Sequence, residues 1–272
     1  MDKTTQNSTL KSIVITGSTR GIGYGLAAAF LERGCAVTVS GRAQAGVAQA
    51  LESLGSQYGA ERLHGLTCDV REAGQVQALW EAARGRFGQV DIWVNNAGLT
   101  GAQANVWQLS AEEARQVIET NLLGAIHGSQ AAITGMLAQG FGAIYNMEGM
   151  GSDGRTHAGL VLYGTTKYAL RYFSDSLVKE TTGTGLVIGA LRPGMVLTDL
   201  VTRQYESRPE EWQRLRRVFN LIAERAEVVA PWLAGQMLAN REHGRRIRYL
   251  TTGRLLKRMA LVLFRKRDLF AP

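Results

Sequence analysis

Residues 12–34, SIVITGSTRGIGYGLAAAFLERG, decide the fold class. The apolar run at 12–16 predicts a buried strand, and the apolar positions after Gly23 recur at helical spacing until Gly34, a typical helix stop. Glycines between the two elements would let the backbone approach a pyrophosphate, while the helix N-terminus supplies N–H groups. We therefore predict a dinucleotide site here, although a tight turn without a ligand could use the same residues.

The end of the next strand indicates which dinucleotide binds. This strand, predicted over 36–40, ends in Ser40-Gly41-Arg42. Folds that prefer NAD commonly place Asp or Glu at this point to hold the ribose 2′-hydroxyl. This chain has no acid there, and Arg20 lies in the glycine-rich turn. Two guanidinium groups favour a 2′-phosphate, so we predict NADP(H), whereas either arginine alone could be a solvated loop residue.

Strand and helix patterns alternate along most of the chain. Further strands are predicted at 62–67, 90–94, 143–147 and 186–192, and helices at 43–58, 71–87, 110–138 and 162–182. This alternation predicts a single α/β domain over 1–272, a Rossmann-like doubly wound parallel sheet. The ligand crevice of such a sheet lies beyond the carboxyl ends of its strands. At those ends fall the glycine-rich turn, Arg42, Asp69, Asn95–Gly98, the 148–157 loop and Pro193–Thr198.

Two polar residues within this framework have alternative interpretations. Asp69 could cap the helix at 71–87, bind an adenine amino group, or do both. Asn121 lies among apolar residues of a helical pattern. It indicates a buried amide or a kink, with purely structural hydrogen bonding as the alternative.

Tyr163 and Lys167 stand four residues apart in a predicted helix, so their side chains lie on one face. A nearby ammonium group favours phenolate and lowers the pKa of tyrosine from its ordinary value of about 10. The pair therefore predicts a proton donor or acceptor that works near neutral pH. The spacing alone is common in helices, where such a tyrosine packs and such a lysine is solvated.

Composition limits the class of protein. A hydrophobic content of 45% with 32 Gly and only 4 Pro is typical of a globular chain. The net charge of +8 favours anionic ligands, anionic membranes or nucleic acid, but no nucleic-acid motif is present. We expect Cys35 and Cys68 to be reduced and buried in a cytoplasmic protein. We see no signal peptide, no apolar run of the ~20 residues that span a membrane, and no metal-ligand spacing among the histidines.

An ordered set of residues resembles the short-chain dehydrogenase/reductase family over nearly the whole chain. The matching residues are Thr16-Gly17-Ser-Thr-Arg-Gly21-Ile-Gly23, Asp69, Asn95-Asn96-Ala97-Gly98, Asn121, Tyr163-x-x-x-Lys167 and Pro193-Gly194. The resemblance implies hydride transfer between NADP(H) and a carbonyl or alcohol, and often a homodimer or homotetramer. Tyr163 would be the general acid in reduction, Lys167 would lower its pKa and hold the nicotinamide ribose, and Asn121 would position a water.

The same resemblance implies which residues bind the cofactor. They are Gly17, Ser18, Thr19, Arg20, Gly21, Ile22, Gly23, Ser40, Arg42, Asp69, Val70, Asn95, Ala97, Gly98, Tyr163, Lys167, Pro193, Gly194, Val196 and Thr198.

One position departs from the family pattern. Family members usually carry a serine after the fifth strand that hydrogen-bonds the substrate oxygen, and here that position falls on Gly149. Support would have to come from a backbone N–H, from Ser152 or from nowhere, and losing one such donor can cost about 10²–10³ in rate. A serine introduced at Gly149 would then raise the rate if no substitute donor exists. A sensor that binds NADP(H) without effective chemistry is the alternative class.

A second stretch is similar to one subgroup, the chlorophyll b reductases of plants and their bacterial relatives. It is NMEGMGSDGR at 146–155, followed by Tyr163 and Lys167. The similarity implies reduction of the 7-formyl group of chlorophyll b or chlorophyllide b to 7-hydroxymethyl with NADPH. Steroids, quinones or other bulky apolar carbonyls are the alternative substrates. The absence of a plastid transit sequence suggests a soluble bacterial member.

The last third of the chain is expected to cover the substrate. Residues 200–226 resemble the family's variable lid, an amphipathic helix whose apolar residues line a pocket or pack on the core: Leu215, Val218, Phe219 and Ile222. Residues 253–272 form a basic amphipathic tail, of which 254–267 could lie on an anionic membrane surface. The tail could equally pack on the domain or on a neighbouring subunit.

Overall fold

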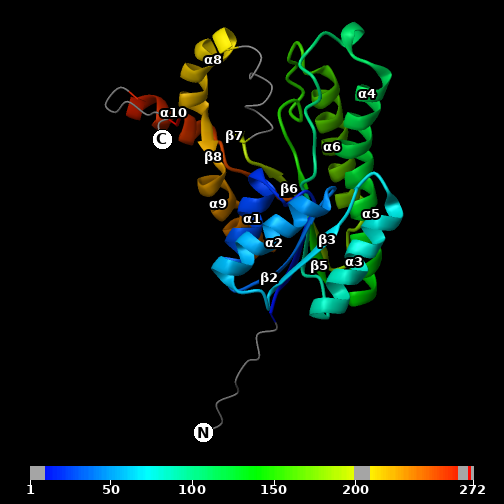
Figure 1. The fold of residues 1–272 in the computed structure, drawn as a ribbon. Helices are drawn as coiled ribbons and strands as arrows, with labels where there is room; N and C mark the ends of the chain where they lie inside the picture. The colour runs from blue at the N-terminus through cyan, green and yellow to red at the C-terminus, as the bar shows by residue number, and fades with distance from the viewer. Residues whose placement is uncertain (1–9, 199–208, 263–268, 271–272) are drawn as a thin grey trace.

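A computed structural model describes residues 10–198, 209–262 and 269–270 (Figure 1). Its centre is a seven-stranded parallel sheet in the order β3-β2-β1-β4-β5-β6-β9. The strands are β1 (Ser12–Ile15), β2 (Ala36–Gly41), β3 (Leu63–Thr67), β4 (Ile92–Asn95), β5 (Gly142–Met147), β6 (Leu186–Arg192) and β9 (Arg246–Arg248). Six strands confirm the prediction. The sequence pattern missed β9, because two of its three residues are arginines.

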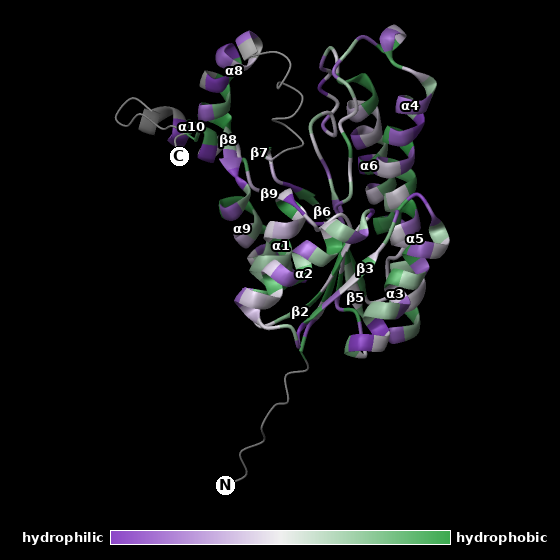
Figure 2. Cartoon of the chain, viewed as in Figure 1, coloured by the Kyte–Doolittle hydropathy of each residue, from purple (hydrophilic) through white to green (hydrophobic). Residues whose placement is uncertain are grey.

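Helices cover both faces of the sheet (Figure 1). One face carries α1 (Gly21–Glu32), α2 (Gln44–Tyr58) and α9 (Ala226–Ala239), and the other carries α3 (Ala73–Phe87), α4 (Ala111–Ile118), α5 (Gly124–Gln139) and α6 (Val161–Glu180). Two hydrophobic clusters, one on each face, enclose the strands. Figure 2 shows the hydrophobic residues gathered on the central strands. Burial on both faces explains the continuous apolar runs of β1 and β2.

The helical region predicted over 110–138 is interrupted at Asn121. After α4 the chain forms a π-helical turn, η2 (Glu119–Leu123), before α5 begins. Asn121 is buried inside this turn. The expected buried amide is confirmed, while the backbone stays helical through Asn121 as a π-helical turn and the alternative of a kink stays a prediction. Cys35 and Cys68 are free and buried, as predicted.

The region after β6 differs from the expected lid. The predicted loop at Pro193–Thr198 contains β7 (Met195–Leu197), which pairs with β8 (Ala223–Arg225) in a second small parallel sheet. The amphipathic helix expected at 210–226 within that lid is α8 (Pro209–Ile222), which ends four residues earlier because the chain enters β8. Residues 199–208 of that lid lie outside the described residues.

The C-terminal tail begins with α10 (Thr252–Val262), which contacts α8. The guanidinium of Arg254 lies 4.4 Å from the centroid of the Trp232 ring and 4.3 Å from that of Tyr249. Arg258 forms an ion pair with Glu224. These contacts favour packing on the domain for this part of the tail, while membrane contact stays a prediction.

Residues 263–268 and 271–272 of the tail lie outside the described residues. None of the helices in the described ranges is long and apolar enough to cross a bilayer.

Candidate active site

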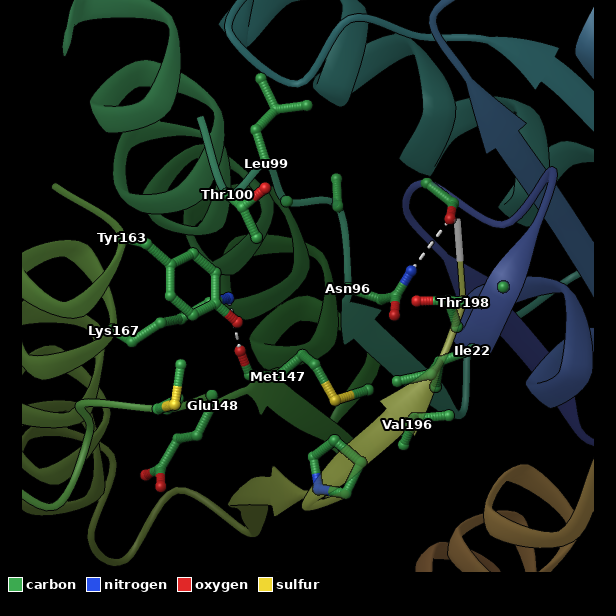
Figure 3. Close-up of a pocket in the computed structure, with 18 of the residues that line it drawn as sticks. Ile22, Asn96, Leu99, Thr100, Met147, Glu148, Tyr163, Lys167, Val196 and Thr198 are labelled. Carbon is green, nitrogen blue, oxygen red and sulfur yellow. Dashed lines mark hydrogen bonds between the residues drawn. The ribbon is translucent and has the colours of Figure 1, made fainter. Parts of the chain in front are cut away.

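A cavity of about 1560 Å³ opens at the carboxyl ends of the strands (Figure 3). The strand order reverses between β1 and β4 at this edge, which is where open α/β sheets bind ligands. The cavity volume exceeds the roughly 300–1,000 Å³ of an ordinary small-molecule site. The cavity can therefore hold a dinucleotide and a second large molecule together.

The glycine-rich turn is pressed against the turn that follows β4. A β-carbon at Gly17 would lie 2.8 Å from the Ala97 Cα, and one at Gly23 would lie 2.5 Å from the Asn96 Nδ2. The Asn96 side-chain amide donates to the Thr16 and Gly17 carbonyls, at 2.9 Å each (Figure 3). Gly17 and Gly23 are therefore required for this close packing. The first turn of α1 lines the cavity together with the Ile22 and Tyr24 side chains, and its N-terminus suits a pyrophosphate.

Most residues predicted to bind the cofactor line this cavity. They are Gly17, Thr19, Arg20, Gly21, Ile22, Gly23, Arg42, Asp69, Val70, Ala97, Gly98, Tyr163, Lys167, Pro193, Gly194, Val196 and Thr198. The residues of this set come from the ends of β1, β2, β3, β4 and β6 and from α6.

Ser18, Ser40 and Asn95 are exceptions, because their side chains are buried away from the cavity. The Ser18 hydroxyl donates to the Ile15 carbonyl at 2.7 Å and accepts from the Ser40 N–H at 2.9 Å. The Asn95 amide donates to the Asn146 Oδ1 at 2.8 Å. These side chains brace the turns from beneath, and a contact of the three residues with the cofactor, which their backbone could make, stays a prediction.

Asp69 does not cap α3, and that prediction is also wrong. Glu72 occupies the position that precedes the helix, and Asp69 instead holds Arg71, with 2.6 Å between the Asp69 Oδ2 and the Arg71 Nη2. Hydrogen bonds from Arg71 hold the pKa of Asp69 below its ordinary value. Asp69 remains an ionised residue at the cavity wall, as an adenine contact requires.

Arg20 and Arg42 are both exposed at the cavity. Within the described part of the chain, neither forms an ion pair with an acidic side chain. Arg42 is near enough to Asp69 for its charge to help lower the pKa of that carboxyl, while both guanidinium groups stay exposed at the cavity, which fits the predicted recognition of an anionic group.

Tyr163 and Lys167 share one face of α6, as predicted. The Lys167 Nζ donates to the Met147 carbonyl at 2.9 Å and lies 5.7 Å from the centroid of the Tyr163 ring (Figure 3). Burial raises the pKa of Tyr163 to about 12. Burial also lowers the pKa of Lys167 to about 8, against the opposing charge of Glu148.

The expected lowering of the Tyr163 pKa is therefore wrong for this structure, because desolvation outweighs the lysine. Tyr163 remains protonated at neutral pH, which is the state that a general acid needs.

Asn121 does not line the cavity. Its Oδ1 accepts from the Leu99 N–H at 2.7 Å, and its Nδ2 donates to the Leu99 carbonyl and to the Thr166 hydroxyl. Asn121 thus fastens the loop after β4 to α6, and the predicted contact with a water stays a prediction.

The model of the family described as short chain dehydrogenase matches residues 11–209. The chain belongs to the short-chain dehydrogenase/reductase family. This family assignment makes it an oxidoreductase with a fold that binds a nicotinamide dinucleotide. The cavity described above is the predicted place for that dinucleotide.

Several relatives of this short-chain dehydrogenase/reductase are known. It is 35% identical over 268 residues to the probable chlorophyll(ide) b reductase NYC1 of Oryza sativa chloroplasts, an alignment that covers 93% of this chain and 52% of that protein. It is 36% identical over 233 residues to the O. sativa chlorophyll(ide) b reductase NOL, with 84% and 66% covered. The 3alpha-hydroxysteroid dehydrogenase of Mediterraneibacter gnavus is 34% identical over 191 residues, with 70% and 76% covered. The chain thus spans about half the length of the NYC1 protein.

Solved structures agree with the family assignment. An actinorhodin polyketide ketoreductase variant with NADPH superposes with a TM-score of 0.80 at 27% identity, covering 88% of this chain and 95% of that one. The L-sorbose reductase of Gluconobacter frateurii, solved with NADPH and L-sorbose, has a TM-score of 0.76 at 26% identity, with 88% and 94% covered. Levodione reductase, at 21% identity and a TM-score of 0.81, supports the fold alone.

The missing serine of this short-chain dehydrogenase/reductase has a steric explanation. A β-carbon at Gly149 would lie 2.3 Å from the Tyr163 hydroxyl oxygen and 3.0 Å from its Cζ. Ser152 is not the substitute donor, because its buried hydroxyl donates to the Glu148 Oε2 at 3.3 Å. Of the alternatives named for the missing donor, Ser152 is therefore excluded, and the backbone N–H groups of the cavity-lining Gly149–Gly151 remain.

Apolar side chains that carry no motif also line the cavity. They are Leu99, Met147, Met150, Leu160, Phe219, Ile222, Leu250 and Leu255. Of the four predicted lid residues, Phe219 and Ile222 belong to this set, Leu215 packs in a small cluster with Phe219, and Val218 is 49% exposed. Thr100, another residue that sequence reasoning missed, lies beside Tyr163 (Figure 3). Leu99 and Thr100 follow β4, and their position after a strand was the signal that could have indicated them, whereas Phe219 and Ile222 were predicted from the helical pattern of the lid.

Across the described ranges, no group of three or more His, Cys, Asp or Glu residues is arranged to hold a metal ion.

Proposed function

We propose that this protein is an NADPH-dependent reductase of a formyl group on a large apolar molecule, and that chlorophyll b or chlorophyllide b is that molecule. The product would be the 7-hydroxymethyl compound. The observation that carries the proposal is the placement of Tyr163 at the wall of a cavity of about 1560 Å³ that is also lined by apolar side chains. The likeness to the two chlorophyll(ide) b reductases over 84–93% of the chain supports the choice of substrate.

The residues of the cavity fit the cofactor. The glycine-rich turn and the N-terminus of α1 would hold the pyrophosphate, and Arg20 and Arg42 would hold the 2′-phosphate. Asp69 would face the adenine. When bound, NADPH supplies a hydride to the carbonyl carbon.

The chain's own residues handle the proton and the developing charge. Tyr163 donates its proton to the carbonyl oxygen as that oxygen becomes an alkoxide. Lys167, charged below its pKa of about 8, stabilises the phenolate that remains. An unhindered formyl oxygen can approach Tyr163 at the bare backbone of Gly149, where a serine side chain would stand in the way.

Turnover of chlorophyllide b by the purified protein tests the proposal. We expect NADPH oxidation with an equal amount of 7-hydroxymethyl product, identified by its absorption spectrum. Tyr163→Phe, measured beside it, should bind NADPH and form no product. Tight NADPH binding without reduction of either pigment would reject the substrate and leave the family assignment intact.

A second candidate is a reductase of a steroid or a similar bulky carbonyl. The 34% identity to a 3alpha-hydroxysteroid dehydrogenase and the same apolar lining favour it. A 3-ketosteroid in the same assay separates the candidates, because only one of the two substrates should show a high kcat/KM.

A further inference from the structure

Glu148 is a charged residue that is only 2% exposed, directly before the glycine that replaces the family's serine. Its Oε1 accepts from the Arg246 Nε at 2.7 Å. Its Oε2 lies 3.5 Å from the Arg192 Nε and accepts from the Ser152 hydroxyl. Buried carboxylates persist when they are paired and hydrogen-bonded in this way. Glu148 thus joins the ends of β5, β6 and β9 beneath the cavity.

The same carboxylate closes the turn that begins with it. The Glu148 N–H donates to the Leu191 carbonyl at 2.9 Å, and the Ser152 N–H donates to the Gly149 carbonyl at 3.2 Å. Ser152 is therefore fixed to this turn twice, through its backbone and through its hydroxyl bond to Glu148. Glu148 therefore holds the turn, residues 148–152, at its first and last residues, and the Arg171 Nη1 adds a hydrogen bond to the Ser152 carbonyl at 3.1 Å.

The turn packs against α6 at two points. Gly149 faces the Tyr163 hydroxyl, and a β-carbon at Gly151 would lie 2.7 Å from the Gly164 Cα. The Gly151 backbone is also left-handed, with φ of 93°. The main chain of Gly149–Gly151 therefore lies beside Tyr163, where relatives offer a side-chain hydroxyl. Figure 3 shows the Glu148 carboxylate turned away from Tyr163, so Glu148 itself does not reach the reacting atoms.

We propose that Glu148 is a positioning residue whose buried pairs with Arg192 and Arg246 hold the Gly149–Gly151 backbone against Tyr163. The main-chain N–H groups of that turn then support the substrate oxygen in place of a serine hydroxyl. A buried ion pair adds little net stability in general. A role in fixing local geometry therefore explains the buried Glu148 carboxylate better than a role in stability does. The inference rests on the proposed reductase function for its catalytic part only.

Glu148→Gln, which keeps the size of the side chain and removes its charge, is the test. We expect amide hydrogen exchange of the 148–152 segment to accelerate at least tenfold, because the Arg192 and Arg246 pairs are weakened. With chlorophyllide b we expect kcat to fall by about 10²-fold, since small displacements of aligned groups have effects of that size. The Kd for NADPH should change less than twofold. Glu148→Asp, which keeps the charge, should recover part of kcat and of the exchange protection.

Asp175→Asn is the matched control. Asp175 accepts from the Arg246 Nη2 at 2.8 Å and is 53% exposed, and it makes no contact with the turn. Its substitution should leave both readouts near wild type. Equal losses in Asp175→Asn and Glu148→Gln would overturn the proposal, because the effect would then belong to Arg246.

Unchanged exchange in Glu148→Gln would also overturn the proposal. If Glu148→Gln does not fold, Ser152→Ala is the second variant, because it removes the hydrogen bond between the Ser152 hydroxyl and Glu148. It should also accelerate amide exchange of residues 148–152. Unchanged exchange in Ser152→Ala would overturn the proposal. If the wild-type protein reduces no carbonyl, the proposed function fails, while the exchange measurement still decides whether Glu148 holds the turn.

Discussion

A β-carbon on Gly149 would lie 2.3 Å from the hydroxyl oxygen of Tyr163. Contacts under 3.0 Å are essentially never made by real β-carbons, so any side chain at residue 149 has to displace the phenol or the turn. The general acid of this site is therefore packed directly against main chain. Gly149→Ser is therefore not expected to improve catalysis in this geometry.

Gly149→Ser and Gly149→Ala should both lower kcat by at least tenfold, because either side chain displaces the Tyr163 hydroxyl. Steady-state kinetics with NADPH and chlorophyllide b measure this. A higher rate in Gly149→Ser would show that the phenol has room to move and that a hydroxyl donor was lacking.

Gly164→Ala is the control for that pair. A β-carbon at Gly164 meets nothing within 4 Å, and the residue follows Tyr163 in α6. The substitution should leave kcat unchanged and stabilise the protein by about 0.4–1 kcal/mol, since alanine restricts the unfolded chain.

Tyr163→Phe should reduce kcat by about 10²–10⁴-fold, the usual contribution of a general acid, with NADPH affinity within twofold of wild type. Tyr168→Phe, on the same helix and 57% exposed, should have no effect. Fluorescence titration of NADPH separates binding from turnover. Loss of binding along with turnover in Tyr163→Phe would point to a structural role for the phenol.

The rate of reduction should fall as pH rises through about 8, because Lys167 then loses the charge that stabilises the tyrosinate. Tyr163 does not change the pH–rate profile in that range, since its pKa of about 12 keeps it protonated. A profile of kcat from pH 6 to 10 with saturating NADPH tests this. A constant rate across the whole range would exclude Lys167 as the group that titrates.

Lys167→Met should be inactive but more stable at pH 7, by roughly 3 kcal/mol. Burial lowers the Lys167 pKa in the folded state to about 8, from an ordinary value of 10.5. Between these values the unfolded wild-type chain binds more protons, so wild-type stability rises with pH. The difference in free energy of unfolding between Lys167→Met and wild type should be largest below pH 8 and should decrease toward pH 10.5. Urea unfolding at several pH values measures this difference. A stability difference that does not change with pH would contradict the prediction.

Arg42→Ala should raise KM for NADPH by about ten- to a hundredfold and leave KM for NADH nearly unchanged, because a charge-assisted bond to the 2′-phosphate is lost. Arg84→Ala, which removes an exposed arginine of α3 outside the cavity, is the control. Equal effects on both cofactors would show that Arg42 does not read the 2′-position.

Local sequence determined the fold class and the main chemical residues of this protein. Apolar runs and helical spacing depend on near neighbours, so six of the seven main-sheet strands could be predicted from them. The glycine-rich turn marked the dinucleotide end of the cavity for the same reason. The spacing of Tyr163 and Lys167 placed both on one face of α6, and helix geometry alone guarantees this.

Only the tertiary structure decided which polar groups face the cavity and what burial does to them. The Ser18 hydroxyl turns inward because it accepts from the Ser40 N–H, 22 residues away. Strand β9 forms because it pairs with the free edge of β6. No local sequence pattern indicates this pairing. The pKa of Tyr163 rises because the phenol is desolvated, and that desolvation depends on everything packed around it. Glu148 gains its role from Arg192 and Arg246, which reach it only after β6 and β9 have paired.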